Sequence, residues 1–151
     1  MLELCLIPII SAGLMLPVER PNHATYLHTG SVLAIQSCSV GLGGFVKATT
    51  ENLYAGGGQY GWAVTVAGVE YSLKLQLGLS HTTVPEHNLP RSTQFYLGPE
   101  INVCYSGWCG GLSYGHMSNG SKLGMCSDAS CRPNVGEDVL MWTVGRKFNL
   151  F

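Results

Sequence analysis

Apolar and polar side chains alternate without a break along Val69–Ser80, and the run Trp62–Val66 shows the same habit upstream. A period of two residues is that of a β-strand with one apolar face and one polar face. Gly68 lies between the two runs and indicates a turn or a bulge. This stretch of the chain therefore predicts two strands joined by a short connection.

Weaker forms of the same pattern cover most of the remaining chain. Further strands are expected over 30–40, 44–54, 93–105, 108–118 and 139–148. Glycines at 41, 43–44 and 56–58 are expected to separate the early strands, because glycine often marks turns. Ser106 and Gly107 form a predicted two-residue hairpin turn between the strands 93–105 and 108–118. No helix of ordinary length is expected.

Seven or eight antiparallel strands in one domain of this length suit a small up-and-down barrel or a sandwich. On the strand 69–80 the polar face carries Glu70, Lys74 and Gln76. An outer-membrane barrel keeps such residues inside and presents its apolar face to lipid, whereas a soluble sandwich does the reverse. Alternation alone does not separate these two folds.

Composition favours the barrel. Charged residues make up 11% of the 151-residue chain, against roughly 25% in an average soluble protein, and apolar residues make up 46%. A membrane, or burial in a larger assembly, would account for this. We therefore expect an all-β fold, namely a small antiparallel up-and-down β-barrel of about eight strands of the outer-membrane type. The net charge of -1 gives no basic surface, so nucleic acid is not an expected partner.

The two ends of the chain differ in what they predict. No apolar run is long enough for a transmembrane helix, and the stretch from Leu4 to Leu16 is interrupted by Pro8. Residues 1–28 are expected to form an N-terminal arm or a first strand, with a weak signal segment as the alternative, and residues 29–151 the barrel domain. The final strand carries Gly145 and ends on Phe151, which resembles the C-terminal signal of bacterial outer-membrane barrels.

Four of the six cysteines form two closely spaced pairs. Cys104 and Cys109 flank the predicted hairpin turn, where a cross-strand disulfide is geometrically feasible. Cys126 and Cys131 can close a small loop in the same way. Free thiols and a four-thiolate metal site are the alternatives. Disulfides are favoured, no metal or cofactor is expected, and disulfides would imply an oxidising compartment or a virion surface.

A histidine and a serine two residues apart carry the candidate chemistry. His116 and Ser118 lie on one face of a predicted strand, and Asp138 begins the next one. A base, a hydroxyl and a carboxylate are the parts of a serine-hydrolase triad, with His116 as base, Ser118 as nucleophile and Asp138 as the orienting acid. Such a pair also arises by chance, with His116 capping a sheet edge and Asp138 serving a turn. Glu137 is the alternative acid.

The residues 112–148 resemble the lipid A 3-O-deacylases (PagL-type), which are also grouped with acyloxyacyl-hydrolase-like proteins. That family has a His-x-Ser-Asn strand end, an Asn-x-Gly-x-acid loop, and a closing strand with a glycine and an aromatic residue. The matching residues here are His116-Met117-Ser118-Asn119, Asn134-Val135-Gly136-Glu137-Asp138, Gly145 and Phe148.

The resemblance implies an eight-stranded outer-membrane barrel with its site on the lipid-facing surface. It also implies an oxyanion hole formed by the Asn134 side chain and the backbone N–H of Gly120. Two features depart from the family pattern. Asp138 stands where a glutamate is expected, and the loop before it is longer and carries Cys126 and Cys131.

Three functions follow as hypotheses. The first is a serine esterase in the outer membrane that removes an ester-linked acyl chain from lipid A or a related glycolipid, with lipopolysaccharide or another membrane lipid as its partner. The second is a non-enzymatic β-barrel structural protein, such as a phage virion or tail component that contacts the host outer membrane and has assembly partners in the virion. The third is a soluble β-sandwich with a disulfide-stapled binding face.

Overall fold

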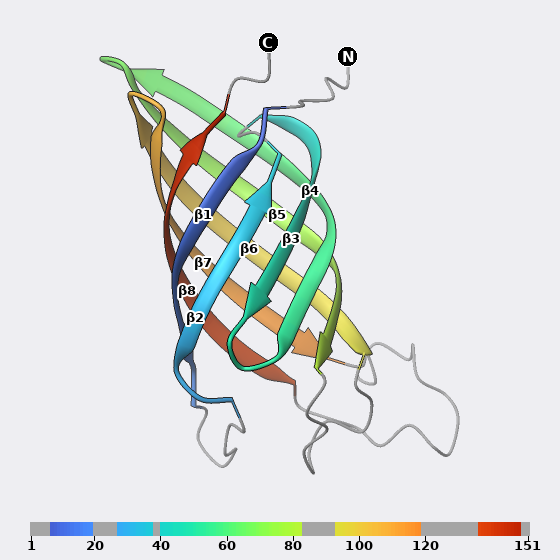
Figure 1. Cartoon of the computed structure of the whole chain (residues 1–151). Coiled ribbons are helices and arrows are strands. Elements are labelled where there is room, and N and C mark those ends of the chain that lie inside the picture. Colours follow the sequence, from blue (N-terminus) through green and yellow to red (C-terminus); the bar gives the residue numbers. More distant parts are fainter. Residues whose placement is uncertain (1–6, 20–26, 38–39, 83–92, 119–135, 149–151) are drawn as a thin grey trace, which may run out of the picture.

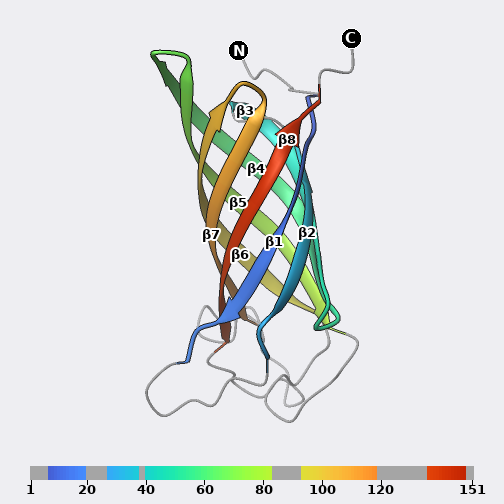
Figure 2. The ribbon, with the colours of Figure 1, turned by 60° about the vertical axis from the view of Figure 1, so that its left-hand side comes forward.

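The chain folds into a closed barrel of eight antiparallel strands, each paired with its neighbours in sequence (Figure 1). The computed structural model describes residues 7–19, 27–37, 40–82, 93–118 and 136–148. Pairing of the first strand with the last closes the barrel (Figure 2). The strands are β1 (Ile9–Pro17), β2 (Gly30–Gln36), β3 (Gly41–Thr49), β4 (Leu53–Val66), β5 (Val69–Thr82), β6 (Thr93–Tyr105), β7 (Trp108–Ser118) and β8 (Glu137–Lys147). The predicted all-β barrel is confirmed.

The β6–β7 hairpin forms where the sequence predicts it. Its turn residues Ser106 and Gly107 both have positive φ, at 49° and 81°. Two such residues are typical of the type I′ turn, whose twist matches that of the flanking strands. The sequence predicts either an N-terminal arm or a first strand within residues 1–28. Residues 9–17 form the strand β1, which pairs with β2 and β8.

The expected role of the early glycines is wrong for all but one of them. Gly41 begins β3 with a φ of 82° and lies at the β2–β3 junction, as expected. The glycines at 43–44 and 56–58 lie inside β3 and β4, and the chain turns between these two strands at 50–52, where Asn52 has a φ of 56°. Gly57 faces Gly78 directly across the β4–β5 pair. A Cβ at Gly57 would lie 2.2 Å from the Leu77 carbonyl oxygen, so these glycines permit close strand approach rather than break the strands.

Polar side chains and a cluster of apolar ones fill the barrel, and apolar side chains cover it. On β5, Lys74 and Gln76 are fully buried, whereas Leu77 next to them is 56% exposed. The same alternation runs through the other strands, so the polar face of the 69–80 pattern points inward, as an outer-membrane type barrel requires. The described part of the chain contains no helix long and apolar enough to cross a membrane.

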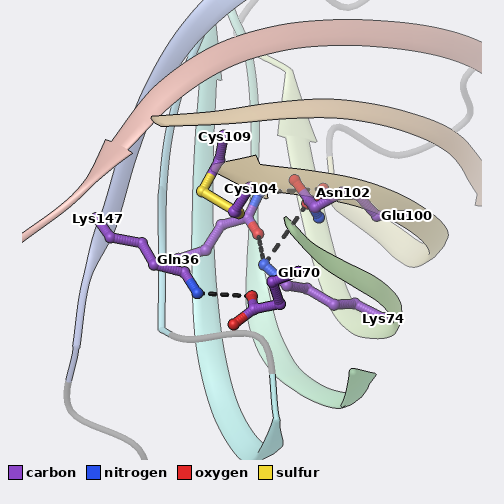
Figure 3. Close-up of a disulfide and its surroundings, with 8 residues drawn as sticks. All are labelled: Gln36, Glu70, Lys74, Glu100, Asn102, Cys104, Cys109 and Lys147. Carbon is purple, nitrogen blue, oxygen red and sulfur yellow. Dashed lines mark hydrogen bonds and ion pairs between the residues drawn. A yellow bond between two sulfur atoms is a disulfide. The ribbon is translucent and has the colours of Figure 1, made fainter. Parts of the chain in front are cut away.

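Glu100 is the centre of the buried polar network. Its Oε2 accepts hydrogen bonds from Lys47 Nζ at 3.1 Å and from Gln36 Nε2 at 3.0 Å. Its Oε1 accepts one from Asn102 Nδ2 at 2.7 Å, and Figure 3 shows Glu100 with Gln36, Lys74 and Asn102 around it. Lys74 Nζ lies 3.8 Å from Oε1 and donates to Gln36 Oε1 at 2.7 Å. Side chains from β2, β3, β5 and β6 thus meet across the interior and hold opposite walls together.

A disulfide joins Cys104 and Cys109 just inside the β6–β7 turn (Figure 3). Both cysteines are buried and pack with Ile9 from β1. Their Cα atoms are 4.0 Å apart, which is close to the spacing of a non-hydrogen-bonded antiparallel pair. The predicted disulfide is confirmed for this pair, while Cys126 and Cys131 lie outside the described residues.

The two ends of the barrel differ. β1 begins and β8 ends at one end, which also carries the two-residue turns after β4 and β6 (Figure 1). The opposite end carries the junctions after β1, β3, β5 and β7, three of which are long in sequence: 18–29, 83–92 and 119–136. This second end is called the loop end below, and the candidate site lies on it.

Candidate active site

His116 and Asp138 face each other across the β7–β8 pair at the loop end. They are direct partners in the strand register, and His116 Nδ1 lies 2.6 Å from Asp138 Oδ1. An ionised carboxylate only accepts hydrogen bonds, so the imidazole donates from Nδ1, and in the neutral ring this leaves the lone pair on Nε2. This tautomer is the one that a general base requires when it takes a proton at Nε2.

Burial separates the two partners. The Asp138 side chain is 1% exposed, whereas that of His116 is 30% exposed. By the alternation of β8, Asp138 is on the outer face together with Leu140 and Trp142, although the carboxylate itself is shielded from solvent. A shielded acid that holds a half-exposed imidazole is the arrangement of an orienting residue and the base it orients.

Ser118 lies on the same outer face of β7, two residues beyond His116. It is half-buried and stands opposite Phe95 of β6 in the register. Between these two described side chains the structure has no hydrogen bond from Ser118 Oγ to His116. Residues two apart on a strand are separated by about 7 Å along the backbone, so the side chains need only reorient to meet. Hydrogen bonds between catalytic groups are often long before substrate binds.

Gly136 packs against the imidazole and was not singled out by the sequence as a contact of His116. Its φ is +81°, and a Cβ there would lie 2.7 Å from His116 Cε1 and 3.2 Å from Nε2. The same Cβ would lie 2.4 Å from the Met117 carbonyl oxygen. A glycine is thus required both for the left-handed conformation and for the space beside the ring. The Asn-x-Gly spacing contains this glycine, but the sequence does not reveal that it contacts the His116 ring.

The neighbouring acid, Glu137, points the other way. It is opposite Met117 in the register, and it lines a small interior cavity together with Leu53 and Gln94. His116 is on the outer face of the wall and Glu137 on the inner face. In this geometry Asp138, and not Glu137, is the carboxylate bonded to the imidazole.

An apolar surface adjoins the His116–Asp138 pair. The outward side chains that continue along β7 and β8 are Tyr114, Leu112, Leu140 and Trp142, and of these Trp142 is 56% exposed. These residues adjoin the pair because β7 and β8 are neighbours in the sheet. An apolar surface thus lies beside the Ser118 hydroxyl and the His116 imidazole.

The two expected oxyanion-hole residues, Asn134 and Gly120, lie outside the described residues, and their role stays a prediction. Within the described ranges, no three or more His, Cys, Asp or Glu side chains are grouped so that they could hold a metal ion. The described part of the site therefore consists of Ser118, His116, Asp138 and the glycine that packs on the ring.

Fold and site together define a class: a closed eight-stranded barrel that encloses a buried ion-pair network, with an apolar outer face and with a histidine–aspartate pair and a nearby serine on that outer face. No family model, no curated protein and no solved structure matches the chain.

Proposed function

We propose that this protein is a serine esterase of the outer membrane that removes an ester-linked acyl chain from lipid A or a related glycolipid. The observation that carries the proposal is the 2.6 Å contact between His116 Nδ1 and Asp138 Oδ1 on the outward, apolar face. Ser118 on the same face supplies the hydroxyl. A buried acid, a histidine and a serine are the set that nucleophilic ester cleavage uses.

The reaction has two halves. Ser118 Oγ attacks the ester carbonyl carbon while His116 Nε2 takes the hydroxyl proton, and Asp138 stabilises the resulting imidazolium. The tetrahedral intermediate collapses, the sugar oxygen leaves with the proton from Nε2, and the acyl group stays on Ser118. Water then attacks the acyl-enzyme with His116 again as base, which releases the fatty acid and restores the serine.

Barrel chemistry supports the proposed location and partner. The outer face presents a largely apolar surface, whereas the Glu100 ion pairs and the amides bonded to them are enclosed inside. Burying so many apolar side chains in lipid is favourable by roughly 25 cal/mol per Å² of apolar area. In such a setting the acyl chain would lie along Leu112, Tyr114 and Trp142, with its ester at Ser118. The disulfide agrees with an oxidising compartment such as the periplasm.

A release assay tests the proposal. Purified protein incubated with lipopolysaccharide is expected to release a 3-hydroxy fatty acid, and Ser118→Ala is expected to release none above background. Ser31→Ala is a matched control, because Ser31 is also a serine on the outer face at the loop end but lies on β2. No release by the wild-type protein, or equal release by Ser118→Ala, would contradict the proposal.

The second candidate is a non-enzymatic barrel, such as a virion component that contacts the host outer membrane. The observation that favours it is that Ser118 Oγ and His116 are not hydrogen-bonded to each other in the described structure. The same assay decides between the two candidates, because a purely structural barrel would release no fatty acid from any lipid.

A further inference from the structure

Outward-facing polar side chains are rare on the eight strands, and most of them gather in one place. In the described strands they are Ser31, His81, Thr93, His116, Ser118, Asp138 and Arg146. Five of these seven lie on the adjacent strands β5 to β8 at the loop end. We call these five, namely His81, Thr93, Ser118, His116 and Asp138, the polar strip. Two of its members, His81 and Thr93, have no part in the proposed triad.

His81 and Thr93 are built as a pair. They are direct partners in the β5–β6 register, and His81 Nδ1 lies 3.0 Å from Thr93 Oγ1. Both side chains are exposed. On β6, Phe95 faces Ser118, and Thr93 is the next outward residue toward the loop end. Thr93 and Ser118 are therefore diagonal neighbours on adjacent strands, and such neighbours are about 7–8 Å apart. The His81–Thr93 pair thus lies next to the candidate nucleophile.

Whichever tautomer His81 adopts, this pair offers a hydrogen-bond donor to a ligand. If the imidazole donates from Nδ1 to Thr93 Oγ1, the threonine hydroxyl can donate outward. If the hydroxyl donates to Nδ1, the proton of the ring is on Nε2 and points away from the threonine. Oxygen atoms with negative charge are the acceptors that such a site prefers.

We propose that His81 and Thr93 form a headgroup subsite that binds a phosphate oxygen of an acylated, phosphorylated sugar. This inference rests on the proposed function, because it places the ester at Ser118 and the phosphate two strands away. Tyr54, directly opposite His81 on β4, extends the subsite with an outward aromatic ring that is 43% exposed. The acyl chain and the headgroup then lie on opposite sides of Ser118, the chain over the apolar wall and the headgroup at the rim.

Kinetics with two matched substrates test the subsite. The substrates are an acylated sugar with a phosphate and the same sugar without it, both in the same detergent micelles. For His81→Phe combined with Thr93→Val, the KM of the phosphorylated substrate is expected to rise about tenfold with kcat unchanged, which is the loss of one hydrogen bond to a charged group. The KM of the phosphate-free substrate is expected to stay at the wild-type value, and Ser31→Ala is expected to change neither. An equal rise for both substrates, or no rise, overturns the subsite.

A binding measurement separates this inference from the proposed function. In Ser118→Ala protein, which cannot turn over, calorimetric titration with the phosphorylated substrate is expected to show about tenfold weaker binding when the two subsite substitutions are added. If the wild-type protein hydrolyses nothing but this loss is seen, the esterase proposal fails and the subsite stands. If hydrolysis occurs and the loss is absent, the subsite fails and the esterase stands. Unchanged circular dichroism spectra confirm that each variant is folded.

Discussion

Glu100 and Asp138 both hold cationic or ionisable partners, and they do so in opposite surroundings. Glu100 lies inside, where its side chain and that of Lys47 are each 2% exposed and its oxygens accept bonds from Lys47, Gln36, Asn102 and Gln76. Asp138 is on the outer face and is bonded to His116, whose side chain is 30% exposed. Four strands meet at Glu100, whereas Asp138 orients a single ring toward the outside.

The difference teaches which group serves the fold and which serves chemistry. A buried ion pair that loses one partner leaves an uncompensated charge, so the Glu100 network is expected to control stability. An imidazole with an oriented tautomer and access from outside is expected to control reactivity. The comparison predicts that substitutions at the two carboxylates change different measurements.

The largest expected effect is on catalysis. Asp138→Asn should lower the rate of deacylation by about three to four powers of ten, because the amide no longer fixes the required tautomer or stabilises the imidazolium. Its unfolding midpoint should stay near that of the wild-type protein. Fatty-acid release and urea unfolding in lipid vesicles measure the two quantities. A large loss of stability with activity retained would reverse the comparison.

The next effect is on stability. Glu100→Ala should lower the free energy of unfolding by about 3–5 kcal/mol, because Lys47 and Lys74 are left without their buried counter-charge. Urea unfolding in vesicles checks this, with Glu51→Gln in the β3–β4 turn as the matched control. Any fatty-acid release should fall only in proportion to the folded fraction. An unchanged midpoint would show that the interior network does not stabilise the barrel.

A pair of glycine substitutions sharpens the comparison. Gly136 and Gly107 have the same φ of +81°, but a Cβ at Gly136 would contact the His116 ring, whereas one at Gly107 meets nothing within 4 Å. Gly107→Ala should lose about 1–2 kcal/mol of stability from left-handed strain, and Gly136→Ala should lose more, because its Cβ would also clash with the Met117 carbonyl oxygen. Only Gly136→Ala should also lower kcat, by about 10- to 100-fold, since the displaced ring loses its alignment. Equal activity of the two variants would remove Gly136 from the site.

The smallest effect concerns the disulfide at the end of the barrel away from the site. Replacing both Cys104 and Cys109 by serine should lower stability by about 2 kcal/mol, as expected for a short closed loop. Activity per folded molecule should not change, because the bridge lies at the opposite end from His116. A selective loss of activity would show coupling between the two ends that the contacts do not suggest.

Patterns between residues close in sequence predicted most strands of the barrel. The alternation of 69–80 predicted β5, and Ser106–Gly107 predicted the β6–β7 hairpin, because both depend on neighbours in sequence. The inward direction of the polar face did not follow from the alternation, and it was the low charge of the chain that favoured it. The glycine clusters were misassigned because their function depends on strand pairing: Gly57 needs Gly78 opposite it. The Glu100 network could not be predicted either, since it depends on which inward side chains meet across the lumen.

In the candidate site, too, the features that depend on neighbours in sequence were predictable, and those that depend on strand register were not. That His116 and Ser118 share a face follows from the period of a strand, and the structure places both outward. That Asp138 stands opposite His116, with Glu137 turned inward, depends on the β7–β8 register, which a connection as long as 119–136 leaves open in the sequence. The contact of Gly136 with the imidazole is a consequence of the same register.

Labelling of the serine by a fluorophosphonate tests the central claim most directly, because this reagent reacts with serines that a histidine activates. Mass spectrometry of the wild-type protein in micelles should find a single adduct, on Ser118, and labelling should be lost in Ser118→Ala and strongly slowed in Asp138→Asn. Ser31→Ala should be labelled like the wild-type protein. Absence of an adduct in the folded wild-type barrel, or an adduct on another residue, would contradict the account.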